Sequence, residues 1–281
     1  MLQSFVVTLR ETLEAALIVG IVLSYLAKIK QTQYNKLIFI SVGAGILASI
    51  IFAFVFTQLA SGFEGRNEEI FEGVTMLITV VFLTFMILWM LRNKQISTDL
   101  QNKIDVAVKG SYKYGLFILV FIAIFREGIE TVLYLWGIDR VNDGINIISA
   151  LSGIVVAIVL GYIIFRTSLR VNLKVFFNLT STLLIFFAAG LLAHGVHELQ
   201  EAGVIPIVTE HVWDINPPVV EEGVFPLLHE KGFIGGFMKD LFGYNGNPSL
   251  IEVVSYFLYF IVAFGLWANI NRKQRKLAPA P

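Results

Sequence analysis

The hydrophobic pattern divides the chain into long apolar stretches that are separated by polar connections. The apolar stretches cover residues Phe5–Ala27, Leu37–Leu59, Ile70–Leu91, Leu116–Trp136, Ile147–Phe165, Leu173–Ala193 and Ile251–Ala268. As α-helices, they are long enough to cross a hydrocarbon core of about 30 Å. The pattern therefore predicts an all-α, polytopic membrane protein with seven transmembrane helices.

The connections alternate in charge, and this alternation predicts the orientation. Fifteen of the 21 basic residues fall on one side, opposed there only by Asp99 and Asp105. The positive-inside rule places that side in the cytoplasm. We therefore expect the N-terminus outside and the C-terminus inside, in a plasma membrane or a bacterial inner membrane. The basic residues on the cytoplasmic side are Lys28, Lys30, Lys36, Arg92, Lys94, Lys103, Lys109, Lys113, Arg166, Arg170, Lys174, Arg272, Lys273, Arg275 and Lys276.

An internal repeat relates the first and fourth predicted helices. The motif Arg10-Glu11-Thr12-Leu13-Glu14 matches Arg126-Glu127-Gly128-Ile129-Glu130 at an offset of 116 residues. An odd number of helices per unit inverts the second unit relative to the first, as in many transporters. We expect a three-helix repeat over residues 1–91, a second over 92–195, an extracytoplasmic cap over 196–248, and a seventh helix with a basic cytoplasmic tail over 249–281.

Small residues follow one face of the second and fifth predicted helices, a pattern that favours close helix packing. The two stripes are Ser41, Gly45, Ser49 and Ala53, and Ser149, Gly153, Ala157 and Gly161.

Composition narrows the chemistry further. The mean hydropathy is +0.75 and the formal net charge is zero, with no basic tract that would suggest a nucleic-acid partner. The chain has no cysteine, which excludes disulfides, thiolate metal sites and a cysteine nucleophile. The first residues lack a basic segment typical of a signal peptide, so we expect the N-terminus to belong to the mature protein. Any metal ligands must be oxygen or imidazole.

The two Arg-Glu-x-x-Glu motifs place six ionisable residues inside predicted membrane helices. Each would cost at least about 2.5 kcal/mol at a helix centre in lipid, so the side chains should face protein or water. The glutamates of each motif share a helix face. Four carboxylates and two arginines leave a net charge near −2, which suits a dipositive or tripositive cation. A purely structural alternative is that each arginine only neutralises its neighbouring acids.

Counting residues from the predicted cytoplasmic boundary gives a depth for each glutamate. Glu14 lies fourteen residues from Lys28 and Glu127 fourteen from Lys113, or about 21 Å at ~1.5 Å per residue. Glu11 and Glu130 each lie seventeen residues from the same boundaries, about 25 Å deep. The inverted motifs therefore predict two stacked layers of paired carboxylates.

Two further groups near the outer face are candidates for metal capture. Glu68, Glu69 and Glu72 lie at the start of the third predicted helix, where acids also favour the helix dipole without any ligand role. His194, His197 and Glu201 share one helical face with plausible ligand spacing. An ordinary hydrated interfacial face explains that second group equally well.

Around both motifs, the sequence resembles the high-affinity iron permease family, the oxidase-dependent iron transporters, in a bacterial-type form. The resemblance includes Ala15–Tyr25, Glu69-x-x-Glu72-Gly73 through Trp89-Met90, and Leu241-Phe242-Gly243-Tyr244 before Pro248. The first motif has Thr12 where the family often has glycine, whereas the second keeps Gly128.

The resemblance implies seven helices and an iron path through the motif glutamates, which here are Glu11, Glu14, Glu127 and Glu130, beside Arg10 and Arg126. It also implies iron as transported substrate without a permanently bound cofactor, and an extracytoplasmic redox or iron-delivery protein as partner. It leaves ferrous and ferric iron both open.

Two other functions are compatible with the residues alone. Glutamate chains also serve as proton or general divalent-cation pathways. A membrane-embedded enzyme could use the glutamates and histidines as one metal centre, but the predicted topology separates the two sets. The prediction is therefore a transporter and not an enzyme.

Overall fold

The computed structural model describes residues 2–92, 101, 104, 113–142, 144–166, 173–216 and 225–277. Within these residues the regular structure is entirely helical. Several charged residues used for the predicted orientation lie outside the described residues, namely Lys94, Asp99, Lys103, Asp105, Lys109 and Arg170.

Each predicted apolar stretch lies within one long helix. The seven long helices of the described residues are α1 (Leu2–Lys28), α2 (Asn35–Ala60), α3 (Arg66–Arg92), α5 (Lys113–Asn142), α6 (Ile147–Arg166), α7 (Leu173–Glu201) and α9 (Leu250–Leu277). A 3₁₀ turn, η1 (Thr32–Tyr34), joins α1 to α2, and a short helix, α8 (Phe233–Phe242), precedes α9. The prediction of the helical segments is therefore confirmed.

Five of these helices are long and apolar enough to cross a membrane. They correspond to Thr32–Ala60, Arg66–Trp89, Ile147–Phe165, Val175–Glu201 and Leu250–Ile270. Helices α1 and α5 are equally long, but each carries the charged residues of an Arg-Glu-x-x-Glu motif. The charged residues of the motifs therefore explain why α1 and α5 are not among these five helices.

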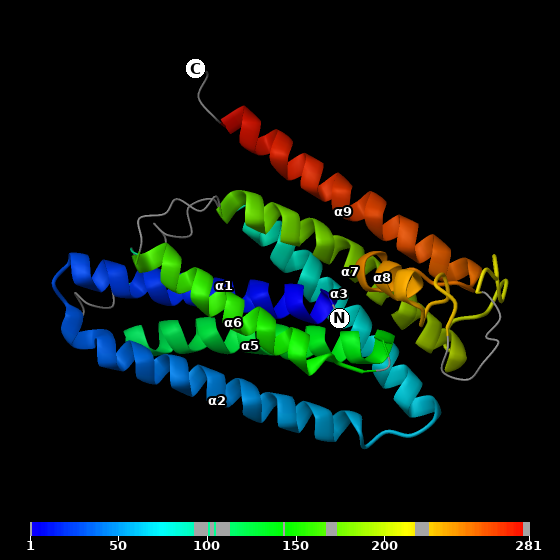
Figure 1. Ribbon diagram of the computed structural model, residues 1–281, viewed down its shortest axis with the longest axis horizontal. Coiled ribbons are helices and arrows are strands. Elements are labelled where there is room, and N and C mark those ends of the chain that lie inside the picture. The colour runs from blue at the N-terminus through cyan, green and yellow to red at the C-terminus, as the bar shows by residue number, and fades with distance from the viewer. Residues whose placement is uncertain are drawn as a thin grey trace.

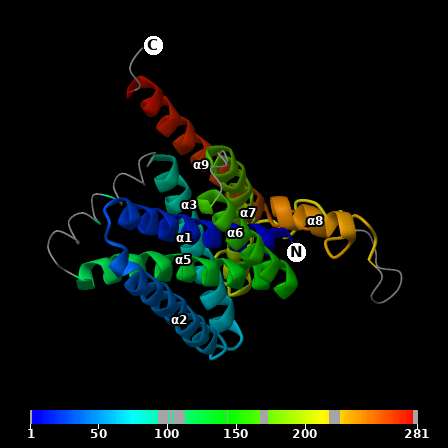
Figure 2. The same ribbon diagram turned by 60° about the vertical axis from the view of Figure 1, so that its left-hand side comes forward.

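Consecutive long helices run in alternating directions through the bundle. In Figure 1, α1 runs from right to left, α2 returns to the right, and the alternation continues to α9. The turned view in Figure 2 shows α1, α5 and α6 at the centre of the bundle, with α2 on one side and α9 on the other. Both motif helices are therefore covered by other helices.

The packing of the helices is crossed between the two halves of the sequence. Helix α2 packs most extensively on α5, and α6 packs most extensively on α1. The small-residue stripes form these contacts, because a Cβ atom at Gly45 would lie 2.9 Å from Ile124, and one at Gly161 would lie 3.0 Å from Ala16. Helices α3 and α7 also pack extensively on each other. Each motif helix is therefore covered by the small face of a helix from the other half.

Polarity is distributed as expected for a protein in lipid. Large apolar side chains are exposed along α2, α6 and α9, including Phe54, Ile148 and Ile261. Polar and charged side chains are instead buried at the centre of the bundle, with Arg10 and Glu11 at most 1% exposed. The hydrocarbon core can solvate the outer surface, whereas the polar groups depend on one another.

The segment between α7 and α9 folds back on itself beside the end of the bundle. The backbone N–H of Val212 donates to Pro248 O, and that of Ile215 donates to Gly246 O, both at 2.9 Å. Helix α8 ends at Gly243, which has φ +65° and contacts the backbone of Gly190 in α7. Glycine suits Gly243 because the backbone is left-handed and a Cβ would meet α7.

Candidate metal site

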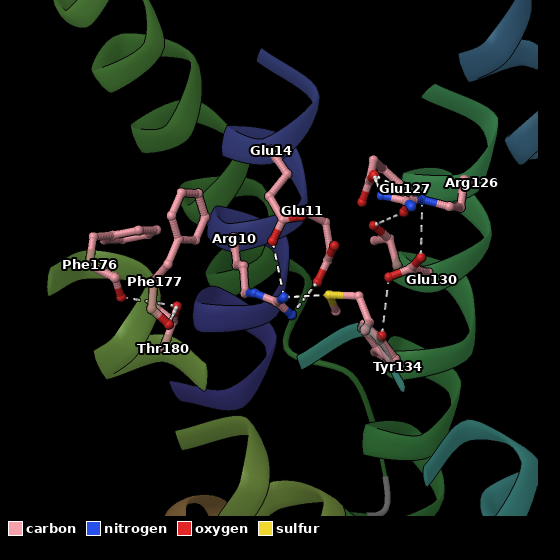
Figure 3. A network of polar contacts seen from close by, with 12 residues as sticks. Arg10, Glu11, Glu14, Arg126, Glu127, Glu130, Tyr134, Phe176, Phe177 and Thr180 are labelled. Atoms are coloured by element: carbon pink, nitrogen blue, oxygen red, sulfur yellow. Dashed lines mark hydrogen bonds and ion pairs between the residues drawn. The ribbon is translucent and has the colours of Figure 1, made fainter. Parts of the chain in front are cut away.

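The two motif helices bring three glutamates together inside the bundle. Glu11 and Glu14 come from α1 and Glu127 from α5, and one carboxylate oxygen of each lies within 4.8 Å of the others. All three residues are buried. Figure 3 shows the side chains of α1 and α5 projecting toward one another from the facing helices. We call Glu11, Glu14 and Glu127 the three-carboxylate group.

Arg10 balances the two glutamates of its own motif. Its Nη1 lies 3.1 Å from Glu11 Oε1, and its Nη2 lies 3.0 Å from Glu14 Oε1. The guanidinium is completely buried and also contacts the thioether sulfur of Met86 on α3. Contacts from α1 and α3 therefore hold the guanidinium in place. A buried guanidinium that lost its carboxylates would destabilise the protein.

Arg126 makes the corresponding contacts in the second motif but is much more exposed. Its Nη2 lies 2.5 Å from Glu127 Oε1, and its Nε lies 3.4 Å from Glu130 Oε1. The side chain is 42% exposed, against 0% for Arg10. Its guanidinium also lies over the ring of Trp89, 5.3 Å from the centroid. The two arginines are therefore equivalent in sequence but not in environment.

The three-carboxylate group has oxygen atoms left available for a ligand. Oε2 of Glu11 and Oε2 of Glu127 are buried and accept no hydrogen bond within the described part of the chain. Buried polar atoms in proteins are nearly always paired, so such atoms suggest a cation, a proton or water. Carboxylate oxygens are the ligands that hard cations prefer.

Glu130 lies outside the three-carboxylate group. Its Oε2 accepts a hydrogen bond of 3.3 Å from the hydroxyl of Tyr134, while its Oε1 faces Arg126. The structure therefore brings together three of the four predicted motif glutamates, while the fourth contacts Tyr134 and shares Arg126 with Glu127 (Figure 3).

The backbone of the second motif is in direct contact with α2. A Cβ atom at Gly128 would collide with the side chain of Ser49. The first motif has Thr12 at the equivalent position, and this side chain is partly exposed. In place of such a contact, α1 is held to α6 through Thr8, whose hydroxyl donates to Ala150 O at 2.8 Å.

Acids at the start of α3 pair with an arginine of α5. Arg140 Nη1 lies 2.6 Å from Glu72 Oε1 and 3.9 Å from Glu68 Oε1. Its guanidinium also lies over the ring of Trp136, at 5.8 Å from the centroid. Glu68, Glu69 and Glu72 do not form a close three-ligand group among the described residues.

The predicted histidine face pairs with glutamates. His194 Nε2 lies 3.4 Å from Glu198 Oε1, and His197 Nε2 lies 3.3 Å from Glu201 Oε1. On its other side, His197 Nδ1 lies 3.0 Å from Oε1 of Glu252 in α9. His194, His197 and Glu201 do not form a close three-ligand group among the residues that the structure describes.

Both histidines line a cavity of about 180 Å³ between α7, α9 and the segment before α9. Glu230 and Lys239 lie on its wall, as does Tyr244. Burial, with a smaller contribution from Glu230, raises the pKa of the Tyr244 phenol. The phenol is therefore neutral at physiological pH.

Four residues of these sites were not identified from the sequence. Met86, Tyr134, Arg140 and Glu252 all contact the predicted site residues. For Tyr134 a signal was present, because it lies one helical turn after Glu130 on the same face. Met86 and Glu252 lie on helices distant in sequence, so their contacts depend on tertiary packing.

A bundle of long apolar helices around buried charged groups is typical of a multi-pass membrane protein of the transporter class. The chain belongs to the Iron permease FTR1 family, whose model matches residues 1–274. The predicted family and the prediction of a transporter rather than an enzyme are both confirmed.

The chain is similar over nearly its whole length to several proteins. It is 32% identical over 273 residues to the ferrous iron permease EfeU of Shigella sonnei, covering 95% of this chain and 96% of that protein. It is 31% identical over 271 residues to the ferrous iron permease EfeU of Yersinia pestis, covering 95% and 93%. An uncharacterized protein of Archaeoglobus fulgidus is 33% identical over 270 residues, covering 95% and 94%. No solved structure matches the chain significantly.

Proposed function

We propose that this protein imports iron by passing the ion between α1 and α5, with Glu11, Glu14 and Glu127 as its ligands. The observation that carries the proposal is the close approach of three buried carboxylates from two helices, within 4.8 Å. The unpaired oxygens of Glu11 and Glu127 support it, since a cation would satisfy both. Membership of the iron permease family favours iron over other hard cations.

The transported ion is ferrous iron in this proposal. Four motif glutamates and two arginines carry a net charge of about −2 when all are ionised, which a dipositive ion balances. The relatives of Shigella sonnei and Yersinia pestis are both named ferrous iron permeases. A separate extracytoplasmic protein would deliver iron or change its oxidation state.

We place all seven long helices across a plasma or inner membrane, with the N-terminus outside. The alternating helix directions support this topology (Figure 1). The crossed packing of α2 on α5 and α6 on α1 supports an inverted three-plus-three repeat, because exchanging the two halves leaves this pattern unchanged. The ion pairs between Arg10 and its glutamates offset part of the cost of burying charge inside α1.

Glu130 has a separate role in this pathway, as a further ion-binding residue beside the three-carboxylate group. The outer acids Glu68, Glu69 and Glu72 and the residues His194, His197 and Glu201 are placed at the entrance. Glu72 is already paired with Arg140, and His197 is already paired with Glu252. We therefore expect changes at Glu72 or His197 to reduce iron uptake less than changes at the motif glutamates.

Uptake of isotopic iron tests the proposal. We expect Glu14→Gln and Glu127→Gln to keep normal amounts of membrane protein but to lose iron uptake nearly completely, since each removes an anionic ligand at constant size. Glu210→Gln is the control, because Glu210 is exposed in the segment after α7. Normal uptake by Glu127→Gln would overturn the proposal.

Competition separates iron from a general cation pathway. Unlabelled ferrous iron should displace the isotope at lower concentrations than manganese or zinc. Equal competition by all three would show a general divalent-cation transporter, and proton uptake without metal would show a proton pathway.

A further inference from the structure

The two motifs differ one helical turn after their second glutamate. Tyr134 follows Glu130 by four residues, whereas Ile18 follows Glu14 by four. Residues four apart lie on the same helix face, so each side chain can reach the glutamate that precedes it. Of these two side chains, only that of Tyr134 can donate a hydrogen bond to the glutamate.

The ring of Tyr134 is held rigidly. It is completely buried in the apolar cluster that also contains Leu83, Met86 and Leu184. From this position its hydroxyl donates to Glu130 Oε2 at 3.3 Å. A rigid ring with two side-chain torsions loses little entropy when it makes this bond, so it is well suited to fixing a neighbour.

Glu130 consequently has a partner for each carboxylate oxygen and does not join the three-carboxylate group. One faces Tyr134 and the other faces Arg126 at 3.4 Å. Its repeat counterpart, Glu14, belongs to the group and pairs with Arg10. The difference between tyrosine and isoleucine thus accompanies the different placement of the two glutamates.

The geometry points to Tyr134 as a positioning residue that keeps Glu130 apart from the three-carboxylate group as a second station for the ion. This inference rests on the proposed function. With a fourth carboxylate, the group would bind a dipositive ion more tightly, because affinity rises with the number of charged ligands. An ion held by four carboxylates would also leave more slowly, so separating Glu130 favours release.

Steady-state uptake of ferrous iron by the Tyr134→Phe variant tests this role. Without the hydroxyl, Glu130 can turn toward the group. We therefore expect the apparent KM and the maximal rate per transporter both to fall at least threefold. Tyr259→Phe is the matched control, because its buried hydroxyl bonds Thr84 at 2.9 Å, away from the motifs. We expect this control to keep the wild-type KM.

A second change shows whether Glu130 causes the effect. In the Tyr134→Phe background, Glu130→Gln should raise KM again, because the additional carboxylate is removed. A Tyr134→Phe variant with an unchanged or increased KM would overturn the positioning role. So would a fall in KM that persists in the double variant.

The Glu127→Gln variant distinguishes a failure of the positioning role from a failure of the proposed function. If it loses uptake while Tyr134→Phe behaves like wild type, the positioning role alone is wrong. If Glu127→Gln transports iron normally, the proposed function is wrong.

Discussion

Ser49 of α2 fills the space beside Gly128 of α5 that any side chain at position 128 would need. This contact holds the backbone of the second motif against its neighbouring helix, directly between Glu127 and Glu130. The first motif has no equivalent restriction, since Thr12 already carries a side chain there.

Gly128→Ala should therefore displace α5 from α2 and strongly reduce iron uptake. Overpacking of this kind costs about 1–3 kcal/mol. Ser49→Gly removes the obstructing atoms, so the double variant Gly128→Ala/Ser49→Gly should recover most of the uptake. Thr12→Ala is the control and should transport normally. Failure of the double variant to recover would contradict steric contact as the cause.

The two arginines should differ in their effect on stability. Arg10→Ala leaves two buried carboxylates without their cation, and losing one partner of a buried pair typically costs about 3–5 kcal/mol. Arg126→Ala should cost less, because that side chain is 42% exposed and better screened. Thermal unfolding of the purified proteins in detergent measures the difference. Equal losses would show that burial does not distinguish the two sites.

Removal of a charge pair tests whether Glu130 acts only as a partner of Arg126. The variant Arg126→Gln/Glu130→Gln keeps the net charge unchanged and should insert normally, yet show a strongly reduced maximal rate of iron uptake. Lys239→Gln/Glu230→Gln is a charge-balanced control in the outer segment, where the two groups lie 3.8 Å apart. We expect this control to transport. Near-normal uptake by the first double variant would remove Glu130 from the pathway.

His197 should support the start of α9 more than it supports transport. The Ser249 hydroxyl accepts a hydrogen bond of 3.3 Å from the backbone N–H of Glu252. In return, the Glu252 carboxylate accepts one of 3.2 Å from the backbone N–H of Ser249, as in a capping box. His197 and Asn245 fix the same carboxylate at 3.0 and 2.8 Å. His197→Gln should lower the unfolding temperature, with the maximal uptake rate per transporter near wild type. A lost maximal rate at normal stability would assign His197 to the ion path.

The orientation is tested by fusing a reporter that is active only outside the cytoplasm. It should be active when inserted within residues 200–248 and inactive when fused at Pro281. The opposite pattern would invert the topology. A reporter active at both sites would mean that the chain between them crosses the membrane an even number of times or not at all.

The sequence was sufficient for the helices because apolar runs of this length have few alternatives, and all seven lie inside described helices. The number of membrane crossings and the repeat stay predictions, since charges within α1 and α5 make hydropathy alone indecisive. The motif spacing predicted two layers, Glu14 with Glu127 and Glu11 with Glu130, whereas the structure groups Glu11 with Glu14 and Glu127 and leaves Glu130 apart. That depends on the hydroxyl of Tyr134 and on side-chain rotation, neither of which helix periodicity specifies.

The different exposure of Arg10 and Arg126 could also not be predicted from the sequence. Both motifs have the pattern Arg-Glu-x-x-Glu, but their surroundings differ: on α3, Met86 contacts Arg10 and Trp89 contacts Arg126. Two helices with the same sequence motif can therefore provide unequal sites when a third helix contacts them differently.

The crossed packing of the helices has a consequence for biosynthesis. Helix α1 ends at residue 28, but its partners α5 and α6 begin only at residues 113 and 147. At about 5–20 residues per second, roughly 4–17 s separate the synthesis of α1 from the arrival of α5. During this interval the charges of α1 lack the helices that later enclose them. The nascent chain must therefore rely on the insertion machinery, or on the pairing of Arg10 with its own glutamates, until the second half has been made.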